Sequence, residues 1–86
     1  MIDAKAAATV AIKYFNDFYA GSGFSDVKVE EVELTDDNKW LITLGYFDPR
    51  KDDPSPLVFT YGKRKYKIFS IDQDGVVKSM KIRSVE

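Results

Sequence analysis

Helical periodicity is confined to residues 3–20, and this constrains the fold of the chain more than any other sequence feature. In this range apolar residues recur three and four positions apart, so they share one stripe of a helix. The stripe consists of Ala7, Val10, Ala11, Tyr14, Phe15 and Phe18. Asp3 is suited to cap the first turn, and Gly21-Ser22-Gly23 is expected to end the helix because glycine adopts positive φ easily.

The remainder of the chain has the alternating pattern of β-strands. Strands are predicted at about 26–34, 39–47, 57–71 and 76–85. The alternation breaks at Glu30-Glu31, where a β-bulge would return both halves of the strand to one face. Turns are expected at 36–39 and at 72–75, because Asp, Asn and Gly favour turn backbones.

These elements predict a single α+β domain spanning residues 1–86. One N-terminal helix should pack on a four-stranded antiparallel β-meander, which gives two layers. The helix stripe is expected to cover the inner face of the sheet.

Composition excludes most catalytic chemistry. The chain has no cysteine and no histidine, which removes disulfides, thiol nucleophiles, His-containing triads and nearly every zinc site. Asp48, Asp52 and Asp53 lie around prolines, where aspartate is expected for turn formation. We therefore expect a non-enzymatic protein that needs no cofactor and no metal.

No segment has the pattern of a secretory signal or a membrane span. Lys5, Thr9 and Lys13 interrupt or bound the moderately apolar stretch near the N-terminus. The sequence predicts no membrane association and favours the cytoplasm, although the cysteine-free composition suits either compartment.

Charge is balanced overall, at a formal net charge of -1, but unevenly distributed. Residues 62–86 contain seven basic and three acidic residues, whereas residues 26–37 contain six acidic and one basic. One interpretation is that the acidic first strand neutralises the basic last hairpin within the same sheet. A second is that a charged edge recruits a partner, and a third is nucleic-acid binding.

The last hairpin contains the clearest candidate surface. A three-residue loop would place Lys67 opposite Lys81 and Lys65 opposite Arg83. We call these four residues the basic block, and we expect them to share an outward face with Phe69. Tyr66, Ile68 and Ser70 would then face the helix.

A second candidate surface is the loop at 48–56. It contains Arg50 and Lys51, and the aromatic residues Phe47 and Tyr61 flank it in the sequence. Exposed aromatic residues beside a polar loop are typical of interaction surfaces.

Two segments resemble the PepSY and cystatin-like group of small domains. They are Trp40-Leu-Ile-Thr-Leu and the stretch from Arg64 to Ile82, whose Asp-x-Asp-Gly turn is followed by a valine strand. The resemblance implies a helix lying across an antiparallel sheet in a non-enzymatic module that binds or inhibits peptidases. The cystatin inhibitory pattern Q-x-V-x-G is absent, since Gln73 is followed by Asp74-Gly75, and the resemblance assigns no functional residue.

Together these observations predict a non-catalytic module that binds a protein or peptide through the open sheet. A peptidase-inhibitor-like or regulatory role is the version that the resemblance implies. Because sheet edges offer unpaired amides, the same edge is also a candidate for homodimerisation. The alternative is nucleic-acid binding through the basic face of the C-terminal hairpin.

Overall fold

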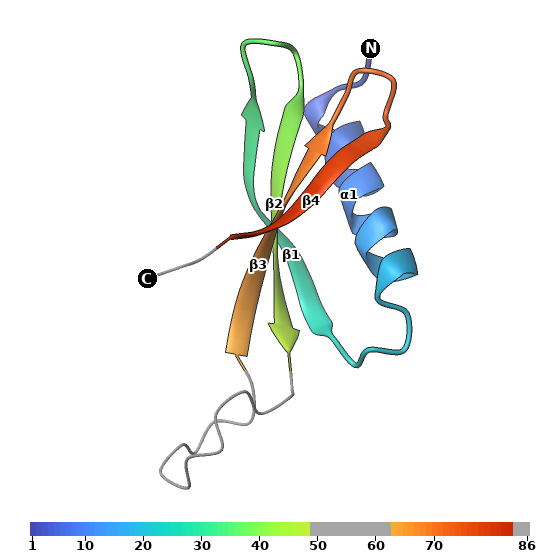
Figure 1. The fold of residues 1–86 in the computed structure, drawn as a ribbon, viewed down its shortest axis with the longest axis vertical. Coiled ribbons are helices and arrows are strands. Elements are labelled where there is room, and N and C mark those ends of the chain that lie inside the picture. The colour runs from blue at the N-terminus through green and yellow to red at the C-terminus, as the bar shows by residue number, and fades with distance from the viewer. Residues whose placement is uncertain (49–62, 84–86) are drawn as a thin grey trace, which may run out of the picture.

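The computed structural model of the protein describes residues 1–48 and 63–83. One helix and four strands follow one another: α1 (Ala4–Phe18), β1 (Ser25–Leu34), β2 (Trp40–Asp48), β3 (Lys63–Ile71) and β4 (Val77–Arg83). Each strand pairs antiparallel with the next, giving the sheet order β1-β2-β3-β4, and α1 lies against one face (Figure 1). The predicted α+β fold of one helix on a four-stranded antiparallel meander is confirmed.

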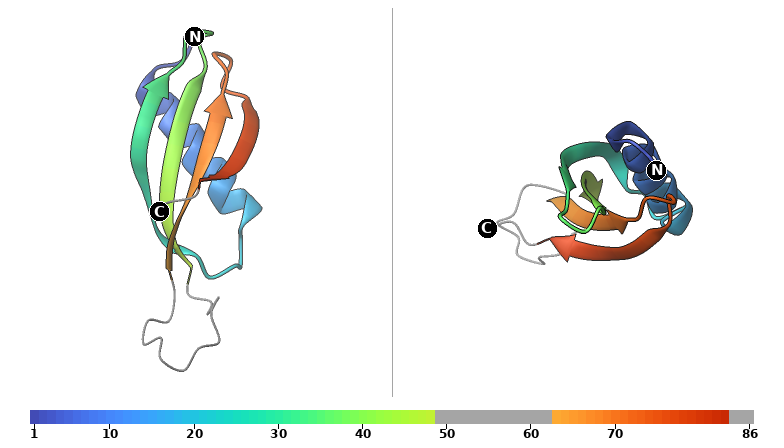
Figure 2. Two further views of the ribbon diagram at one scale, coloured as in Figure 1. Left: turned by 60° about the vertical axis from the view of Figure 1, so that its left-hand side comes forward. Right: turned by 90° about the horizontal axis from the view of Figure 1, so that it is seen from above.

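The sheet is strongly twisted, and α1 runs diagonally across it (Figure 2). The strand positions expected at 57–62 and 84–85 lie outside the described residues. In the ranges that are described, no helix is long and apolar enough to cross a membrane.

The N-terminal end of α1 forms as predicted, whereas its C-terminal end lies at Phe18, two residues before the predicted end. The Ala6 N–H donates to Asp3 Oδ1 at 2.8 Å, which satisfies one of the amides that an α-helix leaves unpaired in its first turn. Beyond the helix, Gly21 and Gly23 take φ values of 80° and 85°, a region that residues with a Cβ atom avoid. The chain can therefore reverse direction and enter β1.

The predicted bulge in β1 is also present. Val29 lies opposite Leu44 and Val32 lies opposite Ile42, so β1 contains one more residue than β2 in this interval. The extra residue keeps both valines on the side of β1 that continues the apolar face of β2.

The core lies between α1 and the two central strands. Ala7, Ala11 and Phe15 are buried at successive four-residue intervals of the helix. They pack with Ile42, Leu44 and Tyr46 of β2 and with Phe69 and Ile71 of β3. Tyr14 and Phe18 belong to the predicted stripe but are 38% and 60% exposed, and they stack on one another at the margin of the core.

The register of the β3–β4 hairpin differs from the prediction by one residue. Next to the turn, Ile71 has its predicted partner. Lys78 is then an extra residue in β4, so Lys67 lies opposite Ile82 and not opposite Lys81. The apolar–polar alternation of β4 does not indicate this second bulge. The bulge shifts by one residue every β3–β4 pair that lies farther from the turn.

The faces of β3 are the reverse of the prediction. Phe69 and Ile71 are fully buried against α1. Lys65 and Lys67 lie on this same helix-facing side of the strand. Tyr66, which was expected to face the helix, occupies the opposite side. Apolar residues occur on both sides of β3, so the alternation of apolar and polar residues could not identify which side faces the helix. The register with β2 determines which side that is.

Asp72 holds the turn between β3 and β4. Its Oδ1 atom accepts hydrogen bonds from the N–H groups of Val76 at 3.0 Å and Asp74 at 2.9 Å, and Gly75 takes a φ of 81°. The bond from Val76, followed by the bond from Asp74, holds the pKa of the Asp72 carboxyl below its ordinary value of 3.8.

The different burial of two phenylalanines of α1 predicts different losses of stability when each is replaced by alanine. Phe15→Ala should lower the free energy of unfolding by about 3–5 kcal/mol, because it leaves a cavity among buried side chains. Phe18→Ala should cost less than about 1 kcal/mol, since Phe18 is mostly exposed. Chemical denaturation followed by circular dichroism measures both, and equal losses would contradict this assignment of the core.

The lowered pKa of Asp72 predicts a stability contribution that depends on pH. The contribution is complete above the ordinary pKa of 3.8 and is lost as the pH falls through the lower folded-state value. The stability difference between wild type and Asp72→Asn should therefore be largest near neutral pH and shrink below about pH 4. Thermal unfolding of the two proteins across this range tests it, and a difference independent of pH would refute it.

Candidate functional site

A pocket of about 380 Å³ lies between the C-terminal end of α1 and the helix-facing side of the sheet. Its lining comes from the α1–β1 connection and from β2, β3 and β4: Tyr19, Phe24, Tyr46, Lys65, Tyr66, Lys67 and Ile82. The strand register brings several of these residues together, because Tyr46 lies opposite Lys65 and Ile82 lies opposite Lys67.

Aromatic rings form one wall of this pocket. The ring centroids of Phe24 and Tyr46 are 4.8 Å apart, and those of Tyr19 and Phe24 are 5.1 Å apart. Phe15 contacts the rings of Tyr46 at 4.8 Å and Tyr19 at 4.9 Å, which ties the wall to the core. These spacings are those of favourable tilted aromatic pairs, so the wall is preformed.

Two lysines of β3 enter the pocket in different electrostatic states. Lys65 Nζ lies 2.9 Å from Asp48 Oδ2, and the Asp48 side chain is fully buried. Lys67 is 8% exposed, and its Nζ lies 5.4 Å from the centre of the Tyr19 ring. In residues 1–48 and 63–83 no carboxylate pairs with Lys67 and no oxygen accepts a hydrogen bond from it.

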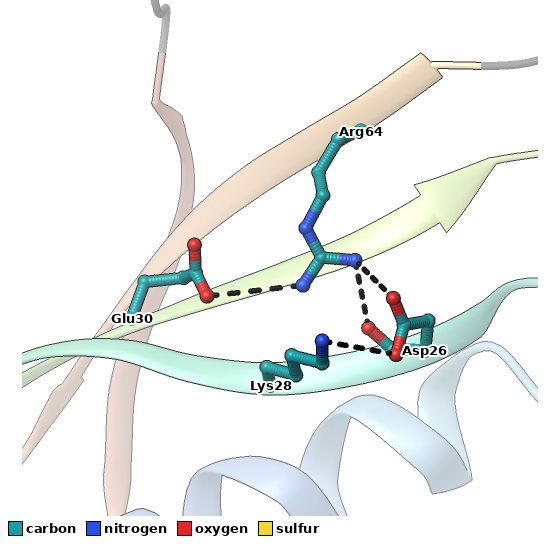
Figure 3. A network of polar contacts seen from close by, with 4 residues as sticks. All are labelled: Asp26, Lys28, Glu30 and Arg64. Atoms are coloured by element: carbon teal, nitrogen blue, oxygen red, sulfur yellow. Dashed lines mark hydrogen bonds and ion pairs between the residues drawn. The ribbon is translucent and has the colours of Figure 1, made fainter.

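The opposite face of the sheet carries a cluster of ion pairs between β1 and β3 (Figure 3). Arg64 Nη1 donates to the carbonyl oxygen of Asp26 at 2.9 Å and to its Oδ2 at 3.1 Å, and Nη2 lies 3.8 Å from Glu30 Oε1. Lys28 Nζ also contacts Asp26, at 3.6 Å. A Cβ atom at Gly45 would lie 3.1 Å from Arg64 Nη2, so glycine lets this cluster lie directly over β2.

The basic block does not form one surface. Lys65 and Lys67 lie on the helix-facing side, whereas Lys81 and Arg83 lie on the other side of the sheet. Phe69, expected beside the block as a stacking residue, is fully buried in the core. The register bulge in β4 and the reversed faces of β3 are the reasons for this separation.

Arg83 forms an ion pair with Glu31 of β1, across the face that also holds Arg64. Lys81 is exposed and has no ion pair within the described ranges. The interpretation that the acidic first strand neutralises part of the basic hairpin is therefore correct for both arginines.

Of the second candidate surface, the structure places only Phe47. It is 36% exposed and lies opposite Arg64, on the side away from α1. Arg50, Lys51 and Tyr61 lie outside the described residues.

Sequence reasoning missed the residues that form the pocket wall. Tyr19 and Phe24 flank the glycines that follow α1, and no role was predicted for either. Tyr46 and Ile82 fall within the strands predicted at 39–47 and 76–85, and no binding role was predicted for them. The usable signal was the pair of aromatic residues beside a glycine-containing connection, but it gives no indication that two β3 lysines lie nearby.

The described residues contain no group of three or more Asp or Glu side chains placed to hold a metal ion. The pocket combines aromatic and aliphatic walls with ammonium groups, a lining of the kind found in small-molecule sites. No protein-family model, curated protein or solved structure matches this chain.

The contrast between the two lysines predicts stability changes of opposite sign. Lys67→Met should raise the free energy of unfolding by roughly 0.5–2 kcal/mol, because it replaces a buried ammonium that lacks an acceptor with an apolar chain of similar length. Lys65→Met should lower it by roughly 1–3 kcal/mol, because the buried Asp48 carboxylate loses a charged partner. Denaturant unfolding of the two variants measures both, and a destabilised Lys67→Met protein would contradict the first expectation.

Proposed function

We propose that this domain is a non-catalytic module that binds an extended, acidic peptide segment of a protein as an added strand along β4. The observation that carries the proposal is the edge of β4. This strand ends the described sheet, and it pairs regularly with β3 from Ser79 to Arg83. Ile82, on the same stretch, is 79% exposed. A regular, uncovered edge offers main-chain hydrogen bonds to an incoming strand.

The other edge of the sheet is less suited to strand addition. β1 contains two irregularities in its pairing, between Ser25 and Lys28 and between Val29 and Glu31. The carbonyl oxygen of Asp26 already accepts a hydrogen bond from an arginine of β3. Bulges and charges of this kind are typical of edges that are protected from pairing.

The charges of β4 favour an acidic partner. The strand Val77–Arg83 has three basic residues and no acidic one. Lys78 contacts Asp72 at 3.6 Å and Arg83 pairs with β1, which leaves Lys81 exposed and available. Opposite charge at an interface accelerates association and selects among partners.

This proposal retains the sequence-based expectation of a protein- or peptide-binding module and relocates its contacts. A PepSY-like or cystatin-like role, in which the bound segment belongs to a peptidase, is one version of it. The alternative of nucleic-acid binding depended on the basic block and on Phe69 as a stacking residue. Because the block is divided between two faces and Phe69 is buried, this alternative has less support than strand addition at β4.

Selection from a displayed library of short peptides tests the proposal. Retained sequences should be rich in Asp and Glu, and Lys81→Glu should weaken their binding by about tenfold or more. Lys5→Glu, at an exposed lysine of α1, is the matched control and should leave binding unchanged. In the complex, amide hydrogen exchange should slow along β4 and not along β1.

Three results would refute strand addition at β4. They are equal binding by Lys81→Glu and wild type, protection of β1 instead of β4, and a protein that is already dimeric with β4 protected before any peptide is added. Light scattering on the free protein checks the last of these.

A further inference from the structure

Among the described residues, Lys67 combines a largely buried side chain with an ammonium that has no hydrogen-bond acceptor. The side chain is more than nine-tenths buried, yet its donors have no acceptor in the described ranges. Lys5 and Lys81 also lack ion pairs there, but both are exposed to water. The contact that the described residues make with this ammonium is the face of the Tyr19 ring, at 5.4 Å from its centre, which leaves the N–H donors of Lys67 without a protein acceptor there.

The accessible part of Lys67 opens into the pocket. Lys67 contributes to the pocket lining, and its Nζ is not among the fully enclosed polar atoms that lack a partner. A ligand entering the pocket therefore meets the ammonium group directly. Such a ligand would supply the acceptors that the described protein residues do not.

The charges around the pocket leave one positive charge to be matched. Lys65 also enters the pocket, but its ammonium contacts the buried carboxylate of Asp48 at 2.9 Å. Lys67 has no equivalent partner in the described residues. Lys67 supplies one compact ammonium, a point charge that a single negative charge such as that of a carboxylate matches.

The residues of the pocket walls indicate the chemistry of the remainder of the ligand. Tyr19, Phe24, Tyr46 and Ile82 surround the ammonium with aromatic and aliphatic surface, and 380 Å³ is within the range of small-molecule pockets. We propose that this pocket binds a carboxylate carried on an apolar body, with the Lys67 ammonium as its charge partner. This site does not depend on strand addition at β4.

Two sources could supply such a carboxylate. One is a free organic acid. The other is an acidic side chain or the C-terminus of a bound peptide, since Ile82 belongs both to the pocket and to the β4 edge. The chemistry at Lys67 is the same in both cases, so the experiment has an arm for each source.

Titration with 3-phenylpropanoate, monitored through backbone amide NMR shifts, tests the site. The acid should shift amides of the pocket residues, and the neutral analogue 3-phenylpropanamide should bind at least about tenfold more weakly, because a charge-assisted hydrogen bond is lost. Lys67→Met should reduce binding of the acid to the level of the amide. Lys5→Met makes the same change at an exposed lysine of α1, outside both proposed sites, and should bind the acid as wild type does.

Equal binding of acid and amide, wild-type binding by Lys67→Met, absence of any binding, or shifts confined to another surface would each overturn the proposal. Circular dichroism confirms that Lys67→Met is folded, so that lost binding is not lost structure. In the second arm, acidic peptides selected by the domain compete with the acid if their carboxylate occupies the pocket. Peptides that bind without competing leave a free organic acid as the source of the carboxylate. If only the Lys81→Glu test fails, strand addition at β4 is refuted and the carboxylate site at Lys67 is not.

Discussion

The close approach of α1 to β2 and β3 is the contact on which the rest of the structure depends. Ala7 and Ala11 have side chains small enough to bring the helix axis near the sheet, and Phe15 fills the space beyond them. In a domain of this size the apolar surface buried in one such contact supplies most of the favourable free energy. The same contact sets the limit of the core, because the pocket begins at Tyr19, one turn beyond Phe15.

The two faces of the sheet carry different interactions. Apolar residues are buried under α1 on the inner face, whereas the outer face carries partly exposed ion pairs between β1 and the arginines of β3 and β4. Arg64 reaches over Gly45 to β1, and Arg83 reaches Glu31 of the same strand. The near-zero net charge of the chain therefore conceals an arrangement in which acidic and basic segments meet across the sheet.

Lys65 and Lys67 have the same side chain, and their positions decide which of them forms an ion pair within the described structure. They are two residues apart on the same side of β3, but only Lys65 reaches the buried carboxylate of Asp48. Lys67 has no such partner among the described residues, and departures of this kind from ordinary packing are expected mainly at functional sites. The pocket and the β4 edge adjoin at Ile82, so one surface could engage both the side chains and the backbone of a bound segment.

Local patterns along the chain were sufficient to predict the elements. The helix with its Asp3 cap, the bulge in β1 and the turn at 72–75 each depend on residues close together in sequence, and all three are present. The inner face of β3 could not be predicted this way, because both of its alternating sets are partly apolar. Packing against β2 and α1, together with the Lys78 bulge, determined that face and divided the basic block.

The pocket is the clearest case of a feature beyond local patterns. Its walls come from the end of α1, from β2 and from β4, and the two lysines come from β3. Whether a lysine is paired, buried or exposed depends on which distant carboxylates and rings the fold places around it. That environment forms only when the strands take their register and the helix covers the sheet, so the residue order identifies the elements while the packing between them creates the site.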